Sequence, residues 1–94
     1  MRTLIWGGSF VRAYRRTVKK NRRLKEAIEA TLRVLAEEPF APRLATHKLK
    51  GKLSGSWACT VAYDTRIVFD FVKDEEGADE AILLLEIGTH REVY

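Results

Sequence analysis

The chain has 94 residues, of which 46% are hydrophobic, and it contains a single cysteine, Cys59. This length is sufficient for one hydrophobic core, so we expect one domain over residues 1–94. One cysteine excludes an internal disulfide framework and a thiolate metal cluster. The longest apolar run is far shorter than a bilayer span, and no apolar leader follows the first residues. We therefore expect a cytoplasmic protein that does not insert into membranes.

The net charge of +4 conceals a strong asymmetry along the chain. Residues 1–52 contain 14 Lys and Arg against 4 Asp and Glu, whereas residues 53–94 contain 3 against 9. A solvated helical face accounts for some of these cations, but so many in about half of a small domain exceed what solubility requires. The first half therefore predicts a surface that binds nucleic acid or another polyanion.

The N-terminal part of the chain predicts a short strand followed by two helices. Residues 3–6 can form the strand, which ends at Gly7. Ser9 is a candidate N-cap for an amphipathic basic helix, in which apolar residues recur at helical spacing. Asn21 is a candidate cap for a second helix, whose apolar stripe runs until Pro39. We expect the two helices to form a hairpin.

The middle of the chain predicts a loop and then two strands. Residues 40–51 have too little periodicity for an element, so we interpret them as a connecting loop. Residues 57–63 alternate with a period of two, as a strand with one buried face does. Asp64 and Thr65 then predict a hairpin turn, and the β-branched and aromatic residues 66–72 predict the next strand.

The last strand is predicted by a long aliphatic run over residues 81–87, between an acidic turn at residues 73–80 and Gly88. A run of this kind indicates a central strand that is buried on both faces. The chain thus has the order β-α-α-β-β-β. This order predicts an α+β fold in which a helical hairpin packs on one face of a small, mainly antiparallel sheet.

Polar groups suited to RNA cleavage occur at three places. The basic loop contains His47, the predicted turn contains Asp64, and the exit of the last strand contains His90. A metal-independent ribonuclease needs a base for the ribose 2′-hydroxyl, an acid for the leaving 5′-oxygen and cations around the phosphate. Histidine suits both proton transfers, and lysine or arginine suits the third role. Two distant histidines without a thiolate pair argue against zinc, and we expect no metal or other cofactor.

Five short segments also carry a family resemblance: residues 10–16, His-Lys-Leu-Lys-Gly at 47–51, Gly-Ser-Trp at 55–57, residues 63–69 and Gly-Thr-His-Arg-Glu-Val-Tyr at 88–94. Together they resemble the RelE/ParE toxin superfamily, and its YafQ-like branch most closely. The resemblance implies a RelE-like fold and the toxin of a type II toxin–antitoxin pair. Such toxins cleave mRNA in the ribosomal A site, and a cognate antitoxin holds them in a hetero-oligomer.

The resemblance also implies roles for individual residues. His47 and His90 match histidines assigned to acid–base work, Asp64 matches an acidic residue of the YafQ-type site, and Tyr94 matches a terminal aromatic that orients the substrate. YafQ-like sites place another histidine near the position of Thr60, and this chain has none there. His47 is then the stronger candidate for the principal base, with Asp64 as its orienter or substitute. Candidates for RNA binding are the loop lysines Lys48, Lys50 and Lys52, together with Arg66 and Arg91, which could instead form surface ion pairs with the acidic turn.

Two other functions fit the same pattern. A ParE-like protein would poison DNA gyrase by binding, without nuclease chemistry, but such proteins generally lack the pair of histidines. A family member that only binds RNA or the antitoxin is the other alternative, because one histidine is missing. The remaining aromatic and thiol side chains predict core positions for Trp6, Trp57 and Cys59.

Overall fold

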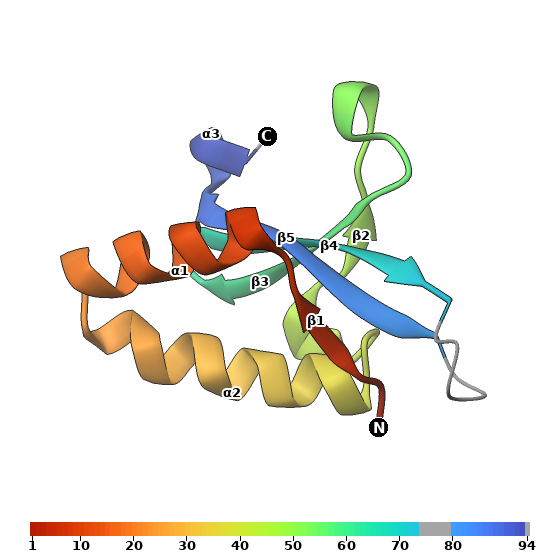
Figure 1. The fold of residues 1–94 in the computed structure, drawn as a ribbon, viewed down its shortest axis with the longest axis horizontal. Helices are drawn as coiled ribbons and strands as arrows, with labels where there is room; N and C mark the ends of the chain where they lie inside the picture. Colours follow the sequence, from red (N-terminus) through yellow and green to blue (C-terminus); the bar gives the residue numbers. More distant parts are fainter. Residues whose placement is uncertain (74–79, 94) are drawn as a thin grey trace.

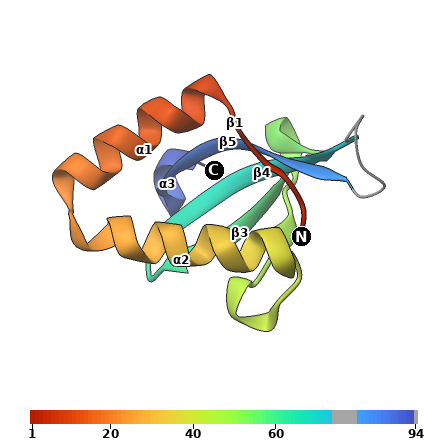
Figure 2. The same ribbon diagram turned by 60° about the horizontal axis from the view of Figure 1, so that its bottom comes forward.

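The computed structural model describes residues 1–73 and 80–93. Two helices cover one face of a five-stranded sheet, which confirms the predicted α+β fold (Figures 1 and 2). The strands are β1 (Leu4–Trp6), β2 (His47–Lys48), β3 (Trp57–Ala62), β4 (Thr65–Val72) and β5 (Ala81–Thr89). The helices are α1 (Gly8–Lys20), α2 (Arg23–Glu37) and α3 (His90–Val93), and 3-10 turns occur at η1 (Pro42–Leu44) and η2 (Gly51–Leu53).

The sheet has the order β1-β5-β4-β3-β2. β1 runs parallel to β5, and the other neighbouring pairs are antiparallel, as predicted. The expected loop over residues 40–51 is wrong in one respect, because it contributes the edge strand β2, in which His47 and Lys48 lie opposite Ala58 and Trp57. β5 lies inside the sheet but next to the central strand β4. Its face away from the helices is only half-buried at Leu83 and Leu85, so burial on both faces is not complete.

The turn from β1 into α1 is set by Gly7 rather than by a side-chain cap. The helix begins at Gly8, so Ser9 lies inside it and the predicted N-cap role of Ser9 is wrong. The Gly7 amide donates a hydrogen bond to the Leu84 carbonyl at 3.1 Å. A Cβ atom at Gly7 would lie 2.7 Å from the same oxygen, so only glycine fits this approach of the chain to β5.

The helical hairpin is held at its turn and across its length. Asn21 Oδ1 accepts a hydrogen bond from the Arg23 amide at 3.1 Å, but the N-cap position of α2 is Arg22, so the predicted cap lies one residue too early. Further along, the Tyr14 hydroxyl donates to Glu29 Oε2 at 3.2 Å. Burial, followed by this contact with a carboxylate, raises the pKa of Tyr14. Both bonds fix α2 relative to α1. The two helices run in opposite directions, as Figure 2 shows.

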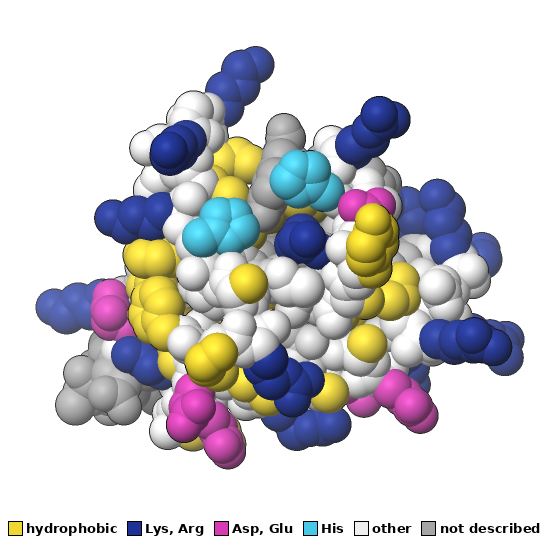
Figure 3. Space-filling view, turned by 180° about the vertical axis from the view of Figure 1, so that it is seen from behind, with side chains coloured by type: hydrophobic (Ala, Val, Ile, Leu, Met, Phe, Trp, Pro, Cys, Tyr) yellow, Lys and Arg dark blue, Asp and Glu magenta, His cyan; other side chains and the backbone are white. Residues whose placement is uncertain are grey.

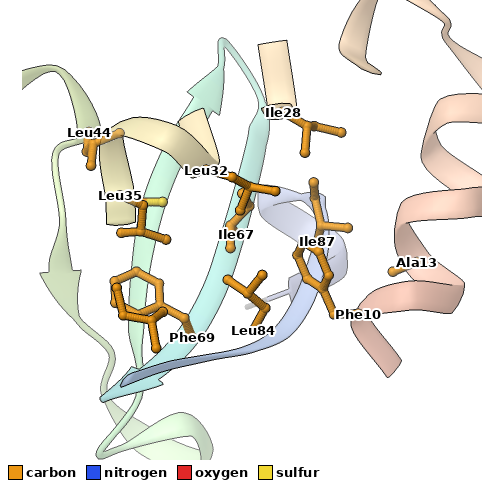
Figure 4. Packing of buried hydrophobic residues seen from close by; sticks show 12 residues of the cluster. Phe10, Ala13, Ile28, Leu32, Leu35, Leu44, Ile67, Phe69, Leu84 and Ile87 are labelled. Carbon is orange, nitrogen blue, oxygen red and sulfur yellow. The ribbon is translucent and has the colours of Figure 1, made fainter. Parts of the chain in front are cut away.

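The main core lies between the helices and the sheet, as Figure 4 shows. Cys59 is fully buried there, as predicted, and burial raises the pKa of its thiol to about 12. Trp57 is half-buried and packs against this core, whereas Trp6 is 42% exposed, so its predicted core position is wrong. Within residues 1–73 and 80–93, no helix is both long and apolar enough to cross a membrane. The largest buried side chains of the core are Phe10, Ile28, Leu35, Leu44, Ile67, Phe69, Ile82, Leu84 and Ile87.

Candidate active site on the open face of the sheet

The sheet face away from α1 and α2, hereafter the open face, carries a second, smaller apolar cluster. It is built on Ala58 of β3 and Val68 of β4, which are cross-strand partners and so project to the same face. Leu49, after β2, and Val93, in α3, cover this pair, and both are largely buried. The cluster therefore fixes two segments that carry candidate site residues: the end of β2 and the short helix α3.

His47 lies on the open face because its cross-strand partner is Ala58. The side chain is exposed, and its Nδ1 atom is 3.0 Å from the Ala45 carbonyl oxygen. A carbonyl only accepts, so Nδ1 carries the hydrogen in this contact and Nε2 is the basic nitrogen of the neutral ring. Ala45 adopts a left-handed backbone with φ 48°, a costly conformation for alanine. That conformation fixes the peptide whose oxygen orients the imidazole.

His90 reaches the same face from the short helix α3 after β5. It is the first residue of α3, and its amide donates to the Asp64 carbonyl at 3.0 Å. This bond ties α3 to the turn between β3 and β4, while Val93 anchors the same helix to the sheet. The imidazole is exposed. Figure 3 shows both histidine side chains close together on this face, with a basic side chain beside them.

Asp64 and Arg66 shape the turn that supports His90. Asp64 contributes its backbone carbonyl, and its side chain is exposed. The Arg66 Nη1 atom donates to the carbonyls of Ala62, Tyr63 and Thr65 at 3.0, 3.3 and 3.2 Å. Arg66 projects from the open face opposite Gly88, but this nitrogen is occupied by the turn. The arrangement supports a structural role for Arg66 in addition to its positive charge.

The three loop lysines do not lie together. Lys48 is opposite Trp57, on the helix-covered side, and its ammonium lies 5.4 Å from the indole centroid. Lys50 and Lys52 lie in the loop after β2 instead and line a hollow of about 290 Å³ with Leu53 and with Leu49 of the open-face cluster. The structure thus separates Lys48 from the candidate site and leaves Lys50 and Lys52 beside it.

Glycines at two positions shape the segment that carries these lysines. Gly51 and Gly55 have φ values of 73° and 99°, which strongly favour glycine. They allow the tight turns around η2, and the segment rises away from the sheet in Figure 1. The exposed ammonium groups are therefore presented by a protruding loop.

The remaining predicted residues have different outcomes. Arg91 is exposed on α3, next to His90. Tyr94 lies outside the described residues, as do residues 74–79 of the expected acidic turn. Thr60, near whose position YafQ-like sites have a further histidine, faces the open side opposite Arg66. These placements bring His47, His90 and the Asp64 turn to one face.

One aromatic side chain at the site was misassigned from the sequence. Tyr63 was expected to end the alternating strand, but β3 ends at Ala62 and Tyr63 lies in the turn with 98% of its surface exposed. A register shift between Thr60 and Ala62 breaks the alternation on which the prediction depended. The Asp-Thr pair after Tyr63 signals a turn, but it does not signal where the strand stops.

The described residues contain no group of three or more His, Cys, Asp or Glu side chains that could hold a metal ion. The chemistry of this face is therefore that of two imidazoles, an acidic turn and nearby ammonium and guanidinium groups. Such a set can act in proton transfer and can bind phosphate.

Comparison with known proteins places the chain in a family. The family model described as the bacterial toxin of the type II toxin-antitoxin system, YafQ, matches residues 2–94. The chain belongs to the YafQ toxin family. It is thus the toxin of a type II toxin–antitoxin system, which confirms the resemblance derived from its motifs, and membership implies an antitoxin as partner. A search of curated protein sequences gave no match.

Solved structures of toxins share the fold. YafQ from E. coli is 14% identical over 100% of this chain and 99% of its own, with a TM-score of 0.76. A YoeB/ParE toxin from Agrobacterium tumefaciens is 23% identical over 94% and 98% of the two chains, with a TM-score of 0.74. These two likenesses show the fold. A metal-bound toxin from Helicobacter pylori is 26% identical over the full length of both chains, with a TM-score of 0.74.

Proposed function

We propose that this YafQ-family toxin is an endoribonuclease that cleaves mRNA in the ribosomal A site without a metal ion. The observation that carries the proposal is the convergence of His47 and His90 on the open face, from the middle and the C-terminal part of the sequence (Figure 3). A structural role does not require two exposed imidazoles on one face. Acid–base catalysis requires two such groups, one on each side of the phosphate.

In the proposed reaction, His47 Nε2 accepts the proton of the ribose 2′-hydroxyl. The 2′-oxygen forms a bond to phosphorus, and the bond from phosphorus to the 5′-oxygen of the next nucleotide breaks. His90, in its protonated form, gives a proton to that leaving oxygen. The products are a 2′,3′-cyclic phosphate and a 5′-hydroxyl. His47 suits the role of base because the Ala45 carbonyl holds its Nδ1 hydrogen and so directs basicity to Nε2.

The cations that surround the reacting phosphate come from groups around the open face. Lys50 and Lys52 are presented by the protruding loop, and Arg91 is exposed one residue after His90. These groups stabilise the charge that develops on the phosphate oxygens. Lys48 has no part in this role, because its ammonium lies over Trp57 on the other side of the sheet. Asp64 acts through its carbonyl to position His90.

Aromatic stacking would hold the base of the cleaved codon. Tyr63 is 98% exposed and is adjacent to Asp64, whose carbonyl holds His90. An aromatic ring in this position can stack on an unpaired base regardless of sequence. Tyr94 remains a second candidate for the same role from the sequence.

The proposed chemistry is tested by the identity of its products. Wild-type toxin is incubated with programmed ribosomes whose A-site codon carries a 2′-deoxyribose at the cleaved nucleotide, alongside the all-ribose message. A parallel reaction uses toxin that was treated with EDTA and desalted beforehand, so that the ribosomes keep their Mg²⁺. We expect cleavage of the ribose message to a 2′,3′-cyclic phosphate, no cleavage of the deoxy message and equal activity of the EDTA-treated toxin. Cleavage of the deoxy message, or loss of activity in the EDTA-treated toxin that added metal restores, would refute attack by the 2′-hydroxyl without a metal bound to the toxin.

A further inference from the structure

A second polar cavity lies on the helix-covered side of the same strand ends. It has a volume of about 260 Å³ and opens where α1 ends above β4 and β5. Its floor contains Thr65 and Thr89, which are cross-strand partners and so project to the same face. That face is the one carrying Ile67 and Ile87 of the main core, because these residues are two positions away along each strand.

The walls of this cavity are basic and rich in hydrogen-bond donors. Arg16 and Lys20 are one helical turn apart on α1, and both line it. Thr17 and Asn21 lie beside them, again four residues apart. The Asn21 side-chain oxygen already accepts from the Arg23 amide, so the side of Asn21 that remains for a ligand is its NH₂ donor. Among the described residues that line the cavity there is no Asp or Glu.

We propose that this cavity binds a phosphate of the substrate RNA strand, next to the phosphate that is cleaved. Two cations, the hydroxyls of Thr17 and Thr65 and an amide donor around this space suit a phosphate group. Its position supports a phosphate from the same strand, because Thr89 directly precedes His90 and Thr65 directly follows Asp64. The strand would pass around the end of the sheet, from the histidines on the open face to Arg16 and Lys20 on the other side.

This inference rests on the proposed function, and it adds a role for the basic helix α1. The predicted excess of cations in the first half of the chain was not tied to any one site. The cavity assigns two of those cations, Arg16 and Lys20, to a defined anion, whereas Arg15 and Lys19 of the same helix do not line it. This difference supplies a matched control.

The test combines charge removal in the protein with charge removal in the RNA. The proteins are wild type, the Arg16→Gln/Lys20→Gln variant and the control Arg15→Gln/Lys19→Gln, which loses the same charge from the same helix. The probe is a fluorescent RNA oligonucleotide with 2′-O-methyl riboses, which resists cleavage, in a series with one neutral methylphosphonate at each linkage in turn. Affinity is measured by anisotropy, beginning at low salt.

For wild type and the control, we expect one methylphosphonate next to the scissile linkage to weaken binding about tenfold. For Arg16→Gln/Lys20→Gln, the methylphosphonate at that linkage should not weaken binding further. In this variant the slope of log affinity against log salt should fall in magnitude by about 0.7. Thr65→Val keeps the branched shape but removes a hydroxyl, so it should reduce the effect of that one linkage. The unfolding free energy of each variant is measured alongside.

Several results would overturn the proposal. One is an RNA affinity that falls equally whichever linkage carries the methylphosphonate. Another is an equal loss of the linkage effect in the control Arg15→Gln/Lys19→Gln. The third is no measurable RNA binding by wild type at low salt. Unchanged RNA affinity in Arg16→Gln/Lys20→Gln with a weakened antitoxin complex would make the cavity a protein-binding site instead. If one methylphosphonate weakens binding of wild type but not of Arg16→Gln/Lys20→Gln, and ordinary RNA is not cleaved, the phosphate site is upheld and the nuclease proposal is refuted. If RNA is cleaved but no methylphosphonate has this effect, the nuclease proposal is upheld and the phosphate site is refuted.

Discussion

Replacing Arg66 with methionine should loosen the turn that holds His90. One guanidinium nitrogen donates to the carbonyls of Ala62, Tyr63 and Thr65 at 3.0 to 3.3 Å. Because a single nitrogen serves all three, we count them as about one full hydrogen bond from a charged group, which contributes about 1.5 to 3 kcal/mol. The methionine stem preserves most of the apolar packing. We therefore expect the folding equilibrium constant to fall about 10- to 150-fold.

The loss is measured by urea unfolding, followed by tryptophan fluorescence, and by hydrogen exchange at the His90 amide. That amide should exchange faster in Arg66→Met, because its bond to the Asp64 carbonyl depends on the same turn. Arg66→Lys keeps the charge but not the planar fork, so it should remain destabilised. An unfolding free energy within about 0.5 kcal/mol of wild type, with reduced RNA affinity that Arg66→Lys restores, would make Arg66 a phosphate ligand and refute the reasoning.

Three further predictions concern the fold and the substrate. Gly7→Ala should lower the unfolding free energy by about 1 to 3 kcal/mol, because its Cβ would meet the Leu84 oxygen at 2.7 Å, whereas Gly8→Ala has room and should change little; equal effects in urea unfolding would contradict this. The Cys59 pKa is raised from 9.0 to about 12, so its contribution to stability is complete below pH 9 and is lost as the pH rises from 9 towards 12. Cys59→Ala should flatten the stability curve in that window, and a thiol reagent should not modify the folded wild type at pH 8; rapid labelling would show that Cys59 is accessible. Tyr63→Ala should weaken RNA binding by about 1 to 3 kcal/mol while Tyr63→Phe retains it, measured by anisotropy, and an equal loss in both would exclude stacking.

The order of the main elements could be predicted because their patterns are long. The stripe of α2 and the aliphatic run of β5 persist over several turns or pleats, so packing and local preference agree. Strand β2 could not be predicted, because two residues, His47 and Lys48, define no period. Its existence depends on pairing with β3, a tertiary contact that a two-residue pattern does not indicate. The pairing of β2 with β3 places Lys48 on the helix-covered side of the sheet, so this placement could not be predicted either.

The candidate site was predicted in its residues but not in its geometry. His47 and His90 could be named as candidates because imidazoles are rare in this chain and these two occur in recognisable motifs. Their convergence depends on α3 folding back over the sheet, which Val93 and the Asp64 carbonyl determine. The exposure of Tyr63 depends on a register shift in β3, and no local residue pattern signals it.

The central claim is tested most directly by primer extension on programmed ribosomes and on free RNA. Wild type is compared with His47→Ala, His90→Ala and the exposed control Lys25→Ala, all verified to be folded. We predict a cut at the A-site codon on ribosomes, a slowing of about 10²- to 10⁴-fold in each histidine variant, and no change in the control. If wild type cuts nothing in either setting, or if both histidine variants cut at the wild-type rate, the proposed catalytic roles are wrong, and inhibition of DNA gyrase becomes the activity to measure.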